Sequence, residues 1–324
     1  MKRRMKKKKT RMTSSEQAHR SCSYFIVPSR LLLLLLTLAI SLSARTGGAV
    51  DAEVEPTYHR IVSLSPLITE NIFLLGAGDS LVGNTFYCQR PHAALDKEKV
   101  GSVMELSIEK IISLRPDLIL ASNLTPLRQV AQLEHLGFRV ETFGQPTSFT
   151  DICTHFLRLG DLLELEKQAQ IIVGQAANKV RTIEYAVAGL PRQKVFLQVG
   201  AHPLFSSVRS SFTHDFIELG GGENIAGNQR SGTIKAEKVV ALDPDVIIIA
   251  VMGSELGGVG AEQQQMWYSY SSMKATRSGR VHVVDPDLVC SPSPTTFADT
   301  LVTIAALIHP QLAKIETAVS SALP

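Results

Sequence analysis

The chain has 324 residues, enough for two domains of ordinary size, and it is 44% hydrophobic but only 6% aromatic. This composition is typical of α/β layers around buried parallel strands. The first 44 residues hold ten of the 33 Lys and Arg and one of the 30 acidic residues, so the remainder carries 23 basic and 29 acidic residues, a net charge of −6. The basic footprint of a nucleic-acid-binding protein is therefore excluded from the folded part.

The N-terminal segment has the three parts of a secretory signal peptide. A basic cluster at residues 2–11 precedes an apolar run at 31–42, and small residues follow. The run is too short to span a bilayer comfortably, and Arg30 prevents it from extending backwards. We therefore predict that residues 1–44 are a cleaved signal peptide and that the mature protein is periplasmic. A retained leader would instead anchor it to the membrane.

Three cysteines remain after this leader, at Cys88, Cys153 and Cys290. An oxidising compartment permits one disulfide and leaves one thiol over. Cys153 falls in an apolar helical pattern and is expected to be a small buried hydrophobe. The other two fall in loops, one in each half of the chain, and the sequence leaves open whether they pair.

In the first half, predicted strands alternate with predicted helices. Pro66 favours the start of a helix directly after the first strand, and Gly76 and Gly78 end that helix. The alternation indicates a mostly parallel sheet covered on both faces, and we assign residues 45–148 to an N-terminal α/β lobe. The strands are expected at 60–64, 81–84, 118–121 and 138–142, and the helices at 65–75, from 107, and at 125–136.

The middle of the chain differs from both halves. Residues 148–163 form one predicted helix, and the apolar residues of 164–188 keep helical spacing without a break. About 25 residues at ~1.5 Å each reach roughly 37 Å, the width of a small domain. Gly189 and Pro191 end this pattern. We therefore predict a helical hairpin at 149–190 whose long helix joins two lobes rigidly.

The second half repeats the alternation, and we assign residues 191–324 to a C-terminal α/β lobe. A glycine-rich loop at 253–260 interrupts it. The strands are expected at 195–199, 246–251 and 281–284, and the helices at 212–219, 236–242 and 294–308.

Two segments that lie 128 positions apart are near copies of each other. Residues 109–120, EKIISLRPDLIL, and residues 237–248, EKVVALDPDVII, each predict an amphipathic helix, a Pro-Asp break and an apolar strand. Half a βαβ unit therefore occurs once in each lobe. Glu109 and Glu237 begin the copies. Either they stabilise the N-termini of their helices, or they lie exposed at the two lobe tips and dock a partner.

Residues that follow strands are candidate ligand contacts. Ser65 and Pro66 lie where the first strand meets its helix, and ligands of open α/β sheets bind at this carboxyl edge. The alternative for Ser65 is plain helix capping. His202 and Phe205 follow a strand of the second lobe in the same way.

Motifs of catalysis and of metal binding are absent from the sequence. It holds no HExxH, no paired CxxC, no GxSxG and no phosphate-binding loop, so we predict no catalytic residue, no resident metal and no cofactor. An exported enzyme using His202 or Cys88 is a less favoured alternative, and a membrane-anchored adhesin or scaffold is a third.

Taken in order, six segments resemble the substrate-binding proteins of metal-chelate ABC importers, a family that carries cobalamin, iron–siderophores or haem. The resemblance extends from Arg60 to about Leu312, and residues 195–225 look most like the cobalamin-binding branch. The segments are RIVSLSP with TE at 60–70, the YCxxP-like loop at 87–91, LSIEKI through LRPD at 106–117, VFLQ at 195–198, ELGGGEN at 218–224, and 281–294.

The resemblance implies an α/β fold of two Rossmann-like lobes with mostly parallel sheets, joined by one long rigid helix, which is the class III periplasmic-binding-protein fold. It implies a binding protein, not an enzyme, that holds a cobalt corrinoid, or alternatively an iron–siderophore or haem, between its lobes. The partners would be an ABC permease and its ATPase in the inner membrane, and we expect a monomer. Glu109 and Glu237 match the positions of permease-docking glutamates. Ligand contacts would fall near Ser65, Pro66, Tyr87, Phe205 and Asp287.

The rim of the implied cleft departs from the cobalamin-binding pattern. Bulky aromatic residues are expected at positions that here hold Val103, Ser122 and Ser231. An arginine expected four residues after Asp287 is Ser291. These differences leave the exact ligand open within the family.

Overall fold

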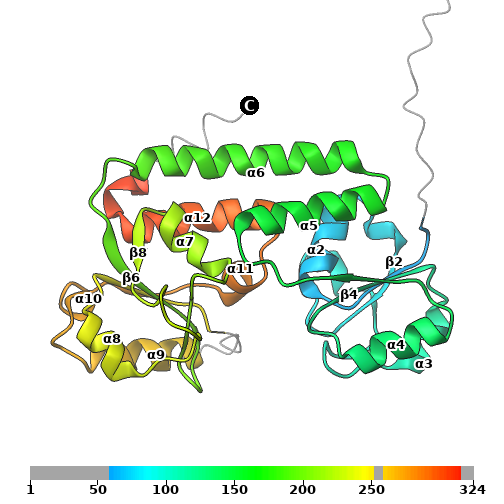
Figure 1. Ribbon diagram of the computed structural model, residues 1–324, viewed down its shortest axis with the longest axis horizontal. Helices are drawn as coiled ribbons and strands as arrows, with labels where there is room; N and C mark the ends of the chain where they lie inside the picture. Colours follow the sequence, from blue (N-terminus) through cyan, green and yellow to red (C-terminus); the bar gives the residue numbers. More distant parts are fainter. Residues whose placement is uncertain (1–57, 252–257, 315–324) are drawn as a thin grey trace, which may run out of the picture. The chain divides into compact units, whose positions relative to one another are not determined.

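The computed structural model describes residues 58–251 and 258–314 (Figure 1). The predicted signal peptide and most of the glycine-rich loop therefore lie outside the described residues. Within those two ranges, no helix combines the length and the apolar character that a membrane crossing requires.

The N-terminal lobe is built on a five-stranded parallel sheet in the order β3-β2-β1-β4-β5. Side chains alternate across it: Ile61 packs in the apolar cluster on one face, and Val62 packs in the cluster on the other. The sheet is thus buried on both faces, as its apolar strands predict. Its strands are β1 (Ile61–Ser63), β2 (Leu81–Asn84), β3 (Glu98–Lys99), β4 (Leu118–Ser122) and β5 (Val140–Phe143), and its helices are α2 (Pro66–Leu74), α3 (Ile108–Leu114) and α4 (Leu127–His135), with single 3-10 turns at Gly78–Ser80 and His92–Ala94.

The C-terminal lobe has a second five-stranded sheet, in the order β10-β9-β6-β7 with β8 paired to β6. All pairings are parallel except that of β7 with β6. The sequence did not predict β7, β8, α9, α10 or α11. The strands are β6 (Gln193–Gly200), β7 (Phe205–Ser206), β8 (Gly222–Asn224), β9 (Val246–Ile249) and β10 (Val281–Val283), and the helices are α7 (Thr213–Leu219), α8 (Ala236–Leu242), α9 (Val259–Tyr268), α10 (Lys274–Arg277), α11 (Pro286–Cys290) and α12 (Pro294–Ile308), followed by a 3-10 segment at Pro310–Lys314.

Helices α5 (Phe149–Leu162) and α6 (Glu166–Val187) join the lobes. The 22 residues of α6 extend about 33 Å. Ala169 and Ile172 of α6 pack in a core of the N-terminal lobe, whereas Val180 and Ile183 pack in a core of the C-terminal lobe. Glu164, which was predicted to begin the long helix, instead adopts a left-handed conformation with φ of 57°. That residue reverses the chain between α5 and α6, so the helix begins later than its apolar spacing suggests.

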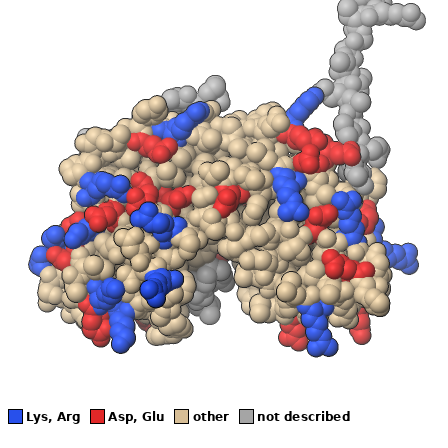
Figure 2. Space-filling view, viewed as in Figure 1, with Lys and Arg blue, Asp and Glu red and all other residues tan. Residues whose placement is uncertain are grey.

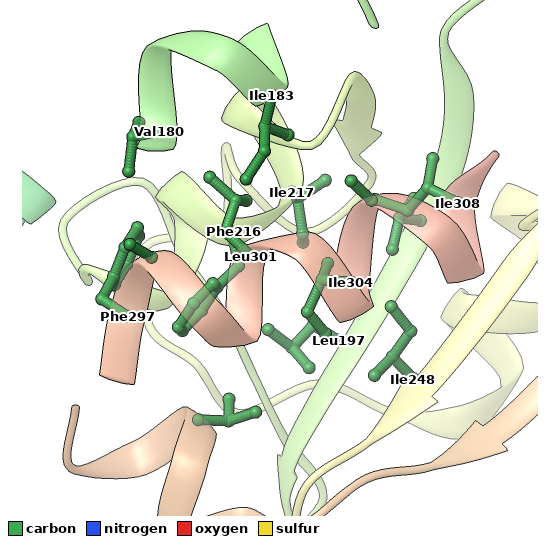
Figure 3. Packing of buried hydrophobic residues seen from close by; sticks show 14 of the residues in the cluster. Val180, Ile183, Leu197, Phe216, Ile217, Ile248, Phe297, Leu301, Ile304 and Ile308 are labelled. Carbon is green, nitrogen blue, oxygen red and sulfur yellow. The ribbon is translucent and has the colours of Figure 1, made fainter. Parts of the chain in front are cut away.

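The C-terminal core shows how α6 is fixed. Phe297 of α12 stacks on Phe216 of α7 at a centroid distance of 4.1 Å, and on Phe149 of α5 at 4.8 Å. Val180 and Ile183 of α6 lie against this layer, above the strands of the sheet (Figure 3). The long helix is therefore packed along its length and not a free linker.

The repeated segments adopt the same structure in both lobes, as α3 with β4 and as α8 with β9. Each helix ends in a left-handed residue with φ of 47°, Arg115 or Asp243. Asp117 then accepts hydrogen bonds from the backbone N–H groups of His59 and Arg60 at 2.8 and 3.1 Å, and Asp245 accepts one from Lys194 at 2.8 Å. Each Pro-Asp aspartate thus fixes the start of the neighbouring parallel strand. This structural role accounts for the Pro-Asp part of the repeat.

Candidate functional site

A cavity of about 420 Å³ is lined by residues of both lobes. Its volume falls in the range of small-molecule sites, and it lies where ligands of α/β sheets bind. The N-terminal lobe supplies most of the wall, from the segments after β1, β2, β3, β4 and β5, and α5 adds to it. The C-terminal lobe supplies Phe212, Asp287, Cys290, Ser291 and Pro292.

Ser65 and Pro66, predicted as ligand contacts, line this cavity. Ser65 occupies the N-cap position of α2, but its side chain makes no capping hydrogen bond. The side-chain hydrogen bond that the alternative role of Ser65 as a helix cap would require is therefore not formed. The residue is buried at the carboxyl end of β1, with its side chain not engaged in capping.

Tyr87 also lines the cavity and is 59% exposed. The loop that carries it is anchored by the buried Cys88, whose thiol lies 3.2 Å from the hydroxyls of both Thr69 and Thr85. The buried thiol of Cys88 thus holds this loop against Thr69 and Thr85. The same loop continues to Arg90, which the sequence did not single out.

Arg90 connects the two lobes through a polar cluster. Its Nε donates to Glu70 at 2.9 Å, and its Nη2 donates to the carbonyl of Ser291 at 3.0 Å. The hydroxyl of Thr296 donates to the other oxygen of Glu70 at 2.5 Å. Glu70 is buried, whereas the Arg90 side chain is 28% exposed, so the ion pair is only partly shielded from water. Glu70 and Arg90 both occur within the segments that carry the family resemblance, but the contact with Ser291 had no signal in the sequence.

Asp287 lines the cavity from α11, where Asp285 caps the helix by accepting from the Asp287 N–H at 2.9 Å. Cys290 follows on the same helix. Burial, with the charges of Asp287 and Asp285, raises the pKa of the Cys290 thiol to about 12. A protonated thiol is a poor nucleophile, so this cysteine is unsuited to catalysis at neutral pH.

The three cysteines predicted to lie in the mature chain are free thiols in the part of the protein that the structure describes. The disulfide that an oxidising compartment permits is not formed between Cys88 and Cys290. Cys153 is buried, as predicted, and burial raises its pKa to about 12.

His155 of α5 is a further lining residue that the sequence did not indicate. Its ring meets Phe143 edge-on, with the ring centroids 6.1 Å apart. Burial lowers the pKa of His155, and the attraction of Asp151 offsets this only in part. The imidazole is therefore neutral at neutral pH.

His202 and Phe205 were predicted as ligand contacts but are not among the residues that line the cavity. β7 folds back antiparallel on β6 and pairs Phe205 with Gly200, and the Phe205 ring lies directly against Gly232. His202 is exposed in the turn between these strands. Their contact with a ligand stays a prediction.

The three rim positions at which the resemblance implies aromatic residues also differ in whether they line the cavity. Val103 and Ser122 line the cavity, whereas Ser231 does not. Met104 and Leu124, beside the first two, line it as well and are 67% and 57% exposed. Flexible side chains thus lie beside two of the positions where the resemblance implies aromatic ones.

Glu109 and Glu237 lie in the first turns of α3 and α8 and are exposed. Both helices lie on the side of the molecule away from α6 (Figure 1). Within the described ranges, neither carboxylate forms an ion pair.

A second hollow of about 380 Å³ is confined to the C-terminal lobe, around Lys274, Arg277 and Arg280. It is more open than the cavity between the lobes, and Lys274 is already 3.6 Å from Asp243 and 3.7 Å from Asp245. On the face in Figure 2, basic and acidic side chains are interspersed. In the described part of the chain, no group of His, Cys, Asp and Glu residues has the arrangement of a metal site.

Known proteins resemble the chain in both sequence and structure. A vitamin B12-binding protein of Yersinia pseudotuberculosis is 32% identical over 205 residues, which cover 62% of this chain and 73% of the relative. The periplasmic vitamin B12-binding protein of Vibrio cholerae superposes with a TM-score of 0.66 at 24% identity, covering 79% of this chain and 98% of that one. A periplasmic haem-binding protein of Pseudomonas aeruginosa gives a TM-score of 0.68 at 25% identity, covering 78% and 93%.

These likenesses confirm the predicted class III fold of two α/β lobes joined by a long helix. They also confirm that the chain is a binding protein and not an enzyme, because proteins of this kind carry a transported ligand. The model of the periplasmic binding protein family matches residues 61–288, and the chain belongs to that family.

Proposed function

We propose that this protein is the substrate-binding component of an ABC importer and that it binds a metal chelate, with a corrinoid favoured, between its lobes. The observation that carries the proposal is the cavity lined by both lobes. The 32% identical vitamin B12-binding relative favours a corrinoid. A corrinoid is larger than the cavity, so it would be held with one part enclosed and the rest exposed.

The contacts that we propose follow the lining of the cavity. Ser65 and Pro66 would meet the ligand at the carboxyl edge of the first sheet, and Tyr87 would offer its ring to the macrocycle. Asp287 would approach from the other lobe. His202 and Phe205 would take part only if the ligand extends beyond the cavity. No resident cofactor is proposed.

Haem or an iron–siderophore is the second candidate ligand. The haem-binding protein of Pseudomonas aeruginosa shares the fold, and the rim here lacks the bulky aromatics at Val103 and Ser122. The neutral imidazole of His155 is a group that iron or cobalt binds readily.

Delivery would occur on the side of the molecule that carries α3 and α8. We propose that Glu109 and Glu237 contact basic residues of a permease, one from each lobe, and that an ATPase drives import. The protein would act as a monomer, exported by a signal peptide at residues 1–44. The lobes would divide at residues 148 and 190.

Isothermal titration calorimetry of the mature protein with cyanocobalamin, dicyanocobinamide, hemin and a ferric hydroxamate siderophore tests the proposal. We expect binding of at least one, with a corrinoid the tightest. The pair of variants Tyr87→Ala and Tyr185→Ala provides the control, since Tyr87 lines the cavity and Tyr185 is an exposed residue of α6 outside it. If none of the four ligands binds, the proposed function is wrong.

A further inference from the structure

Very few polar contacts pass directly from one lobe to the other. Among the described residues, only two hydrogen bonds and no ion pair join residues 58–148 to residues 191–314. Arg90 donates from its Nη2 to the carbonyl of Ser291 at 3.0 Å, and the hydroxyl of Thr296 donates to Glu70 at 2.5 Å. Both bonds therefore end on the Glu70–Arg90 ion pair. Helices α5 and α6 also join the lobes, by apolar packing in the cores of both.

The ion pair is held in one geometry by its own contacts. Arg90 donates from Nε to Oε2 of Glu70 at 2.9 Å, while Thr296 donates to Oε1, so both carboxylate oxygens are engaged. The guanidinium is planar, so the bond at Nε also restricts the direction in which Nη2 points. Glu70 is buried on α2, which follows β1 directly. The N-terminal lobe thus presents a fixed donor and a fixed acceptor to the other lobe.

The two bonds reach the part of the C-terminal lobe that forms the wall of the cavity. Ser291 follows α11 directly, and Thr296 lies in the first turn of α12. This lobe supplies five lining residues, and all of them except Phe212 lie within residues 287–292. Glu70 and Arg90 themselves line the opposite wall. The two bonds therefore connect the two walls of the cavity.

The polar contacts of α11 within its own lobe are weaker. Cys290 donates its thiol to the carbonyl of Ala250 at 3.6 Å, and a thiol is a weak donor. The hydroxyl of Thr300 donates to the carbonyl of Leu288 at 3.4 Å, near the limit for a hydrogen bond. Val289 adds apolar packing in the core. The two bonds between the lobes are shorter and charge-assisted, so they contribute strongly to the position of this segment.

We propose that Glu70 and Arg90 are positioning residues that latch the lobes together before any ligand binds. The latch consists of these two side chains, the Ser291 carbonyl and the Thr296 hydroxyl, and it holds the cavity at one width. A preformed cavity spares the ligand the cost of ordering the second wall. The apparent affinity then falls in proportion to the fraction of molecules that lose this arrangement. The effect on affinity rests on the proposed function, whereas the latch acts in the ligand-free protein.

The test breaks the latch in two ways. Thr296→Val removes one of the two bonds with little change of side-chain volume. The double variant Glu70→Leu with Arg90→Met removes both bonds and both charges together, so that no charge is left unpaired. Thr300→Val is the matched control, because Thr300 lies one turn further along α12 and its hydroxyl bonds to Leu288 of the same lobe. Thr296→Val keeps the test open if the double variant does not fold.

Pulsed electron paramagnetic resonance measures the distance between the lobes in the ligand-free protein. Spin labels are placed at Ser113→Cys on α3 and Ala241→Cys on α8, which are exposed and occupy equivalent positions in the repeat. Cys88 and Cys153 are buried and the Cys290 thiol is protonated at neutral pH, so the added cysteines should take the label. Labelling of the protein without the two added cysteines measures the background.

The unaltered protein and Thr300→Val should each give one narrow distribution of distances. The distribution should broaden by roughly twofold in the double variant, and by less in Thr296→Val, because the lobes then sample more than one separation. A second measurement uses cyanocobalamin in calorimetry. Its affinity should fall by roughly tenfold in the double variant, as expected if about a tenth of the molecules keep the competent arrangement.

The outcomes separate the latch from the proposed function. Distributions in both latch variants as narrow as that of the unaltered protein would show that the latch is wrong, whatever ligand binds. Equal broadening in Thr300→Val would overturn it as well, since that bond does not cross between the lobes. Broadening with unchanged cyanocobalamin affinity would refute the positioning role. If the unaltered protein binds none of cyanocobalamin, dicyanocobinamide, hemin and the siderophore, the proposed function fails while the distances still decide the latch.

Discussion

The two lobes carry the same repeated half-unit but contribute to the cavity unequally. In the N-terminal lobe, the chain passes from β1 directly into α2, so Ser65 and Pro66 reach the cavity. In the C-terminal lobe, the chain leaves β6 and folds back as β7, which keeps His202 and Phe205 out of the lining. The similarity in sequence between the lobes therefore reflects their common construction, whereas the differences between them determine which residues line the cavity.

The proposed docking residues of the two lobes can be tested together by reversing their charge. Reversing charge at both Glu109 and Glu237 to Arg should reduce uptake by at least about a hundredfold, because like charges facing each other across an interface cost several kcal/mol. Ligand affinity should be unchanged, since neither residue lines the cavity. Uptake of labelled ligand by cells measures the effect.

The control for this charge reversal is Glu184→Arg, at a position on α6 that is also exposed and lies away from α3 and α8 (Figure 1). Uptake by this variant should be normal. Full uptake in the double reversal would contradict docking through these residues. The repeat would then serve the architecture alone.

The hydrophobic cores of the two lobes should lose similar stability when one buried ring is removed from each. Phe297→Ala removes the ring stacked between Phe149 and Phe216, and Phe156→Ala removes a ring that is also fully buried but in the N-terminal core. Each should lower the free energy of unfolding by about 3–5 kcal/mol. Urea denaturation followed by circular dichroism measures both. A loss below about 1 kcal/mol for either would show that its core can collapse around the missing ring.

The Pro-Asp aspartates test the repeat itself. Asp117→Asn should lower the free energy of unfolding by about 1.5–3 kcal/mol, because its carboxylate accepts from two backbone N–H groups. Asp245→Asn should lower it by less, because Asp245 accepts from one. Thermal unfolding at neutral pH compares the two variants. An equal or reversed order would mean that the copies do not anchor their strands by these bonds.

The sequence predicted those parts of the fold that depend on local pattern. The helical spacing of apolar residues predicted α6 at 164–188, and the helix extends over Glu166–Val187. The apolar runs after each Pro-Asp pair predicted β4 and β9. It also indicated Ser65, Pro66, Tyr87 and Asp287, all of which line the cavity. Whether they bind a ligand stays a prediction.

The remaining features depend on contacts between distant parts of the chain. Arg90 meets the carbonyl of Ser291 across 201 positions, and no local pattern signals such a pair. β7 is two residues long, too short for the alternation that identifies a strand. Phe205 therefore looked like a loop residue facing a ligand, when its backbone is paired with Gly200.

The smallest effect separates the two aromatic residues that the resemblance assigned to the ligand. Tyr87→Ala should weaken corrinoid binding by about 0.5–1.5 kcal/mol, which is a factor of roughly two to twelve, because its ring lines the cavity. Phe205→Ala should change the affinity by less than that, because its ring covers Gly232 instead. The single tryptophan, Trp267, is fully buried, and its Nε1 donates a hydrogen bond to Gln198 at 2.7 Å. Because this ring lies away from the cavity lining, calorimetry is a better measure of binding than tryptophan fluorescence. An equal loss in both variants would show that the ligand reaches beyond the cavity to β7, and that both lobes contact it through equivalent strands after all.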